Sequence, residues 1–113
     1  MQGRQSQGKI EALAREALTL FRQVNEPKGE AEACCLLGQA LQKRGSLGEA
    51  LCEYEAAKRI MLRLTQCEPQ NAHFQRDLSV VHTWIGSVFQ AQGQLGDALR
   101  EYEAYKQIML RLV

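Results

Sequence analysis

Two stretches of this chain are almost the same: residues 45–64 read GSLGEALCEYEAAKRIMLRL, and residues 93–112 read GQLGDALREYEAYKQIMLRL. A longer alignment, of residues 38–65 with residues 86–113, places the copies 48 positions apart and gives 17 identities in 28 positions. A period of this size is typical of arrays in which each unit buries its apolar face by stacking on the next. The repeat therefore predicts a solenoid.

Apolar residues recur at helical spacing through most of the chain, and no stretch alternates with the period of two that a half-buried β-strand shows. Pro27 and Pro69 interrupt this pattern, and Gly45 and Gly93 stand where left-handed caps would end two helices. We expect five helices, at about residues 10–24, 29–44, 47–67, 71–92 and 95–113. Short loops between such helices predict antiparallel hairpins.

The predicted fold is therefore an all-α solenoid of antiparallel helix hairpins. A chain of 113 residues is one domain by length, so we expect a single domain over residues 1–113. Within it, residues 10–24 form one helix of an incomplete repeat, residues 29–67 the first full repeat and residues 71–113 the second.

Composition excludes several function classes. The chain has 14 basic and 13 acidic residues, so no basic excess attracts a nucleic-acid backbone. No apolar run approaches the roughly 18 residues of a membrane span, and residues 1–9 lack the regions of a secretory signal. The four cysteines form no Cys-x-x-Cys, and His73 and His82 add no metal-ligand spacing. We expect reduced thiols, a cytoplasmic protein and no metal or cofactor.

The residues within each copy resemble the tetratricopeptide repeat. That family has Leu-Gly and a later large residue in the first helix, then an alanine, an aromatic residue and a small residue in the second. The corresponding residues are Leu37, Gly38, Leu41, Ala50, Tyr54 and Ala57 in one copy, and Ile85, Gly86, Phe89, Ala98, Tyr102 and Tyr105 in the other. The 48-residue period exceeds the usual 34, which is similar to extended arrays of the kinesin light chain type and of bacteria.

Two positions depart from the family pattern. The proline that usually closes a repeat is replaced by Leu62 and by Leu110, so the helices continue through that point. Tyr105 replaces the expected small residue and would put a bulky ring at a tight place or at an open end.

The resemblance implies a concave groove lined by the first helix of each repeat. The implied groove residues are Glu32, Cys35, Gln39, Gln42 and Lys43 in one copy, and Val80, Thr83, Ser87, Gln90 and Ala91 in the other. We therefore expect a non-catalytic scaffold that binds a peptide or protein partner through hydrogen bonds on this face. The alternative is a solvated face that binds nothing. The family's carboxylate-binding side chains have no counterpart at Cys35, Gln39 and Thr83.

Individual residues leave further alternatives open. Trp84 is either an exposed anchor for a partner or a side chain packed near Leu36. His82 is expected to pack in the core rather than to act in catalysis, since nothing places acid–base partners around it. The repeated glutamates are expected to be exposed helix charges at Glu53, Glu55, Glu101 and Glu103.

The two ends of the array suggest a second function. Neither end carries an obvious polar cap, which solenoids need. The residues expected to be exposed are Tyr105, Ile108, Met109 and Leu112 in the last helix, and Leu13, Leu20 and Phe21 in the first. They favour a homodimer formed through an end, unless the chain belongs to a longer array. No phosphate loop, activated nucleophile or metal set points to an enzyme.

Overall fold

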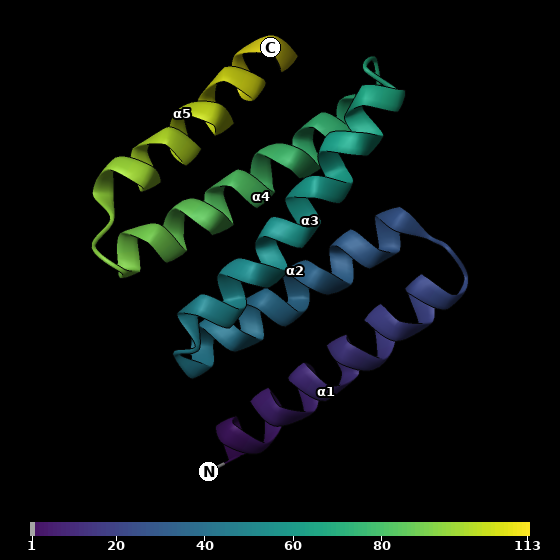
Figure 1. Ribbon diagram of the computed structural model, residues 1–113, viewed down its shortest axis with the longest axis vertical. Helices are drawn as coiled ribbons and strands as arrows, with labels where there is room; N and C mark the ends of the chain where they lie inside the picture. The colour runs from purple at the N-terminus through teal and green to yellow at the C-terminus, as the bar shows by residue number, and fades with distance from the viewer. Residues whose placement is uncertain (1) are drawn as a thin grey trace. The chain divides into compact units, whose positions relative to one another are not determined.

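The computed structural model describes residues 2–113, so that Met1, the first residue of the predicted domain, lies outside the described residues. The described residues form five α-helices and no β-strand (Figure 1). Their bounds are α1 (Gln2–Gln23), α2 (Pro27–Arg44), α3 (Leu47–Cys67), α4 (Ala72–Ala91) and α5 (Leu95–Leu112). The prediction of an all-α protein with five helices is confirmed.

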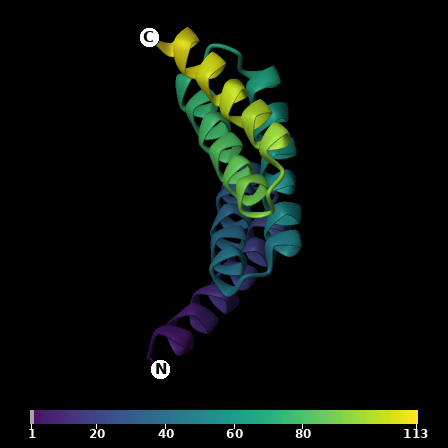
Figure 2. The same cartoon turned by 90° about the vertical axis from the view of Figure 1, so that its left-hand side faces the viewer.

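The chain divides into two compact units, Met1–Ala57 and Lys58–Val113, with the boundary inside α3. In the first unit, α1 and α2 run antiparallel beside one another. In the second unit, α4 and α5 do the same, joined by the short turn at Gly93 (Figure 2). Each unit is thus built on one antiparallel helix pair, as the short loops predicted.

The ends of the helices follow from particular residues. Gly45 and Gly93 have φ angles of 90° and 77°, in the left-handed region that glycine adopts without strain. Asn71 caps α4 by accepting a hydrogen bond from the Phe74 backbone N–H at 3.2 Å. Pro27 opens α2, where its missing N–H is not needed.

The largest difference from the predicted bounds is at the first helix, which begins at Gln2 rather than at Ile10. Residues 2–9 carry no apolar stripe, which is why the sequence pattern did not include them. They are rich in glutamine, arginine and lysine, whose helix propensities are favourable. The periodicity of apolar residues identifies only the part of a helix that packs against a neighbour. The helix propensity of residues 2–9 extends α1 beyond that part.

The core of each unit consists of small and aliphatic side chains, to which the first unit adds the buried Tyr54. Buried side chains of the first unit include Ala14, Leu18, Cys34, Leu37, Leu41, Ala50, Tyr54 and Ala57. Those of the second include Met61, Leu78, Val81, Ile85, Val88, Ala98 and Ile108. The Tyr54 ring lies against Gly38, and the Tyr102 ring lies against Gly86. Among the described residues, no helix is both long and apolar enough to cross a membrane.

Candidate functional site

Most of the predicted partner-binding residues of the second repeat share an accessible face of α4. Val80 has 43% of its surface exposed, and Gln90 is also exposed. Thr83, Trp84 and Ser87 are half-buried. Their spacing of three and four residues places them on one side of the helix, so that an exposed valine stands beside an accessible tryptophan. The second unit therefore presents a surface of mixed polarity here.

The hydroxyl groups of this α4 face are already used as donors. The Thr83 Oγ1 donates to the Val80 carbonyl at 2.6 Å, and the Ser87 Oγ donates to the Trp84 carbonyl at 2.7 Å. Hydroxyl groups in helices commonly bond to the backbone of the preceding turn in this way. We expected this face to bind a peptide through hydroxyl hydrogen bonds. Because these hydroxyl groups already donate to the helix, they could only accept hydrogen bonds from a peptide.

Two residues that were predicted to line the groove form hydrogen bonds with the repeated tyrosines. The Tyr54 hydroxyl donates to Gln42 Oε1 at 2.9 Å, and the Tyr102 hydroxyl donates to Gln90 Oε1 at 3.0 Å. The sequence interpretation missed this role. The available signal was that glutamine occupies the same place in both repeats, twelve positions before a repeated tyrosine.

The predicted partner-binding residues of the first repeat lie on α2. Glu32 and Lys43 are exposed, whereas Cys35 and Gln39 are half-buried, as is Gln42. Leu36, with 50% of its surface exposed, is an accessible apolar residue on the same helix. The predicted partner-binding residues of α2 thus include two charged side chains, Glu32 and Lys43, whereas those of the α4 face include none.

The residues of α5 that were predicted to form a self-association end differ in their exposure. Tyr105 is 37% exposed, but Ile108 is only 9% exposed, and Met109 and Leu112 are half-buried. Ile108 is buried in the interior of the second unit, as Ala98 is. The prediction that Ile108 is an exposed end residue is therefore wrong.

A more continuous apolar stripe runs along α1 to Val24, the residue directly after the helix. Its residues are Ile10, Leu13, Leu20 and Val24, which are 44%, 63%, 59% and 71% exposed, with Ala17 between them. The alternating spacing of three and four residues puts all five on one side of the chain. The neighbouring face of α1 is buried through Ala14 and Leu18. The helix is therefore apolar on two adjacent faces, of which only one is covered in the first unit.

A buried polar cluster joins the three helices of the second unit. His82 Nδ1 lies 2.9 Å from Glu101 Oε1, and Lys58 Nζ lies 3.9 Å from Glu101 Oε2. Only 15% of the Glu101 side chain is exposed, so the expectation that it is a solvated helix charge is wrong. His82 is buried, as expected. The repeat-equivalent residues in the first unit are Cys34 and Glu53.

Burial, with a smaller contribution from the charge of Glu53, raises the pKa of the Cys34 thiol to about 12. A thiol held protonated in this way is a poor nucleophile and a poor metal ligand. In the described part of the chain, no three His, Cys, Asp or Glu side chains gather closely enough to hold a metal ion.

Comparison with known proteins adds no relative. No family model matches this chain, and no curated protein or solved structure matches it either. The resemblance to tetratricopeptide repeats therefore depends on the residues of the chain itself.

Proposed function

We propose that this chain is a non-catalytic scaffold that binds a peptide or protein partner on the α4 face, defined as Val80, Thr83, Trp84 and Ser87. The observation that carries the proposal is an exposed valine beside an accessible tryptophan, Val80 being 43% exposed and Trp84 half-buried. Tryptophan is enriched among the few residues that dominate the energy of protein interfaces. Apolar area of this kind at the centre of a polar helix face suits a partner side chain.

The chemistry of the α4 face limits the partner. Thr83 offers an acceptor oxygen, because its hydroxyl hydrogen is bonded to the helix backbone. Trp84 and Val80 offer apolar contact. The partner therefore brings an apolar side chain for Trp84, flanked by a hydrogen-bond donor for the Thr83 oxygen.

The surrounding architecture is proposed to be a tetratricopeptide-like solenoid. The support is the recurrence of a glycine, a glutamine and a tyrosine in contact, 48 residues apart, at Gly38, Gln42 and Tyr54 and again in the second copy. All four cysteines are free thiols, which favours the reducing cytoplasm as the compartment.

Selection of binding peptides from a displayed random library on the immobilised chain tests this proposal. A Thr83→Arg variant should lower the affinity of the selected peptides at least tenfold, because the arginine covers the α4 face. Thr19→Arg is the matched control, since Thr19 is an exposed helical threonine whose hydroxyl also donates to its own helix, at 3.1 Å. Peptides that bind the Thr83→Arg protein as tightly as the wild type would refute the α4 face as the binding surface.

A second candidate function is self-association through the α1 stripe of Ile10, Leu13, Ala17, Leu20 and Val24. The observation that favours it is that four of these apolar residues are exposed although a neighbouring face of the helix is packed. Contiguous apolar surface of this kind marks an interaction site more often than isolated exposed residues do.

A further inference from the structure

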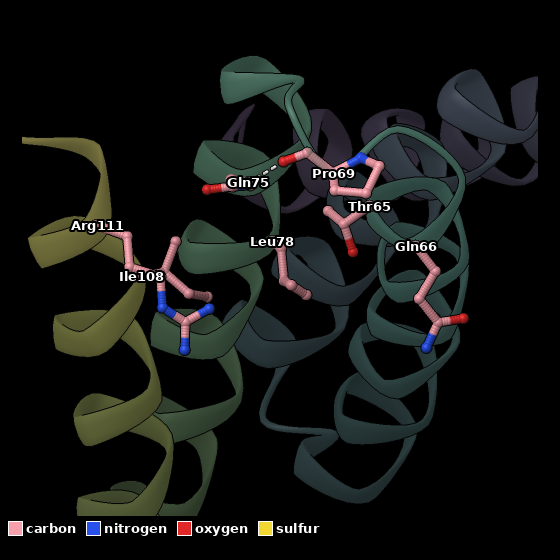
Figure 3. Close-up of a pocket in the computed structure, with 7 residues that line it drawn as sticks. All are labelled: Thr65, Gln66, Pro69, Gln75, Leu78, Ile108 and Arg111. Atoms are coloured by element: carbon pink, nitrogen blue, oxygen red, sulfur yellow. Dashed lines mark hydrogen bonds between the residues drawn. The ribbon is translucent and has the colours of Figure 1, made fainter.

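A small pocket opens at one end of the second unit, away from the α4 face. It has a volume of about 270 Å³ and is lined by Thr65, Gln66, Pro69, Gln75, Leu78, Ile108 and Arg111. These residues come from the end of α3, the loop after it, the first half of α4 and the last turns of α5 (Figure 3). Sites for drug-sized ligands range from about 300 to 1,000 Å³, so this pocket suits a smaller group.

The inner wall of the pocket is apolar. Leu78 and Ile108 are 7% and 9% exposed, and each presents part of its side chain to the pocket (Figure 3). The Pro69 ring lies on the opposite side. A branched hydrocarbon group of four or five carbons would cover this wall and lose its contact with water.

Two internal hydrogen bonds fix the wall before any ligand arrives. The Gln75 side chain donates through Nε2 to the Pro69 carbonyl, which ties the loop to α4. The Thr65 hydroxyl donates to the Leu62 carbonyl at 2.8 Å. A wall that is already ordered costs little conformational entropy when a ligand binds.

The one ionised group that lines the pocket is a cation. Arg111 is exposed, and its guanidinium lies beside Ile108 (Figure 3). Among the described residues, it has no hydrogen bond or ion pair, and no carboxylate lines the pocket. The forked donors of a guanidinium match a carboxylate, and a ligand amine would find no opposite charge here.

We propose that this pocket binds a hydrophobic carboxylate, with the hydrocarbon part on Leu78 and Ile108 and the carboxylate on the Arg111 guanidinium. Two sources share that chemistry: a free short branched carboxylic acid, and the C-terminal residue of a peptide. A polyphosphate is a poorer fit, because a single guanidinium and an apolar wall do not balance its charge. The site does not depend on the α4 face.

Amide chemical-shift titration of the ¹⁵N-labelled chain tests the pocket, with 4-methylpentanoate as the probe. We expect shifts confined to residues that line the pocket and a Kd of about 1 mM, which is ordinary for so few heavy atoms. The uncharged 4-methylpentanamide should bind about three- to tenfold more weakly, because it keeps the hydrocarbon and loses the charge. Equal binding of acid and amide would overturn the role of Arg111.

Two arginine variants sharpen the result. The Arg111→Gln substitution should weaken binding of 4-methylpentanoate by about the same three- to tenfold. The variant should then bind the acid and the amide with equal affinity. Arg63→Gln is the matched control, because Arg63 is the repeat-equivalent residue and does not line the pocket. Both arginines are exposed, so neither change removes a core contact. Equal weakening in both variants would show a general charge effect and overturn the site.

A second pair of probes distinguishes a free carboxylic acid from a peptide C-terminus as the ligand. A tetrapeptide ending in leucine with a free carboxylate is compared with the same peptide carrying a C-terminal amide. Tighter binding of the free peptide than of 4-methylpentanoate supports a peptide terminus as the ligand. Shifts with 4-methylpentanoate alone support a free acid. No shift at the pocket residues with either carboxylate overturns the proposal.

Discussion

The Tyr54 ring occupies the space that a side chain at Gly38 would need. A Cβ atom built on Gly38 would lie 2.5 Å from the Tyr54 Cε1 atom, which is closer than real Cβ contacts come. Tyr54 itself has no exposed surface, and its hydroxyl is held by Gln42. The ring therefore has no space into which it can withdraw, and the approach of α2 to α3 in the first unit depends on the missing side chain.

Gly38→Ala should destabilise the protein by about 1 to 2 kcal/mol. Overpacking of a closed core typically costs about 1 to 3 kcal/mol, and the better helix propensity of alanine returns up to about 1 kcal/mol of this. The free energy of unfolding from urea titrations, followed by circular dichroism, measures the change.

Two other glycines calibrate that measurement. At Gly86 the corresponding Cβ would lie 2.8 Å from Tyr102 Cε1, but Tyr102 is only half-buried and can shift, so Gly86→Ala should cost less. At Gly48, which has no neighbour within 4 Å, alanine should stabilise the helix by up to about 1 kcal/mol. A Gly38→Ala protein as stable as Gly48→Ala would contradict the steric argument.

The Cys34 thiol should make the protein less stable in alkali. Its pKa is raised from 9.0 to about 12, chiefly by burial. Below pH 9 the thiol is protonated in both the folded and the unfolded chain, so it has no effect. Above pH 9 the unfolded chain releases this proton first, and stability falls by up to about 1.4 kcal/mol per pH unit until the folded thiol also ionises. Wild type should lose about 1 kcal/mol between pH 8 and pH 10 from this group.

Cys34→Ala is the control for the alkaline loss, because it removes the titrating group and should flatten this part of the profile. Burial also raises the pKa of Tyr54, so measurements are compared at pH 10 and below. Equal alkaline slopes in wild type and variant would rule out Cys34 as the cause. In the folded protein, a thiol reagent should label the exposed Cys52 and Cys67 long before Cys34.

Much of the fold was predictable because the chain marks its helix ends with residues of special geometry. Gly45, Gly93 and Asn71 each end or begin a helix where expected. The repeat also singled out Gly38 with Tyr54 and Gly86 with Tyr102 as recurring residues, and each tyrosine ring lies against its glycine. These features depend on local backbone geometry or on a comparison within the sequence.

The functional surfaces were less predictable because a single helix pattern does not say which of two adjacent faces packs. On α5 the buried groups include Ile108 and most of the Glu101 side chain, whose carboxylate contacts His82 on α4 and Lys58 on α3. On α1 the covered face is that of Ala14 and Leu18, and the more apolar stripe stays exposed. Gln90 was predicted to bind a partner because the spacing within one helix cannot reveal a hydrogen bond to another helix. In the structure, Gln90 accepts such a bond from Tyr102.

Replacement of Glu101 by glutamine should weaken the second unit. The carboxylate joins His82 at 2.9 Å and Lys58 at 3.9 Å, and it is mostly buried. Glutamine keeps the shape and removes the charge, so the expected loss is about 1 to 2 kcal/mol, in the range of hydrogen bonds to charged groups. Urea unfolding of Glu101→Gln measures it.

Glu53→Gln is the matched control at the equivalent position of the first repeat. There the counterpart of His82 is the protonated thiol of Cys34, which is a weak hydrogen-bond donor, so the loss should stay within about 0.5 kcal/mol. If both variants lose the same stability, the contacts with His82 and Lys58 contribute nothing beyond the helix itself.

The α1 stripe should hold two copies of the chain together. Leu13 and Leu20 are 63% and 59% exposed, and covering a leucine side chain contributes about 1.5 to 3 kcal/mol. The double variant Leu13→Glu, Leu20→Glu keeps a good helix propensity and places charges on the stripe, so it should raise the dimer Kd more than about 100-fold. Light scattering during size-exclusion chromatography, over a range of concentrations, gives the mass of each protein.

Leu99→Glu separates the stripe from exposed apolar surface in general. Leu99 lies on α5 and is 65% exposed, so it matches the α1 leucines in exposure but not in location. The Leu99→Glu protein should dimerise like the wild type, because a change on α5 leaves the α1 stripe unaltered. Loss of the dimer in Leu99→Glu alone would move the interface to α5, whereas a monomeric wild type at every concentration would refute self-association.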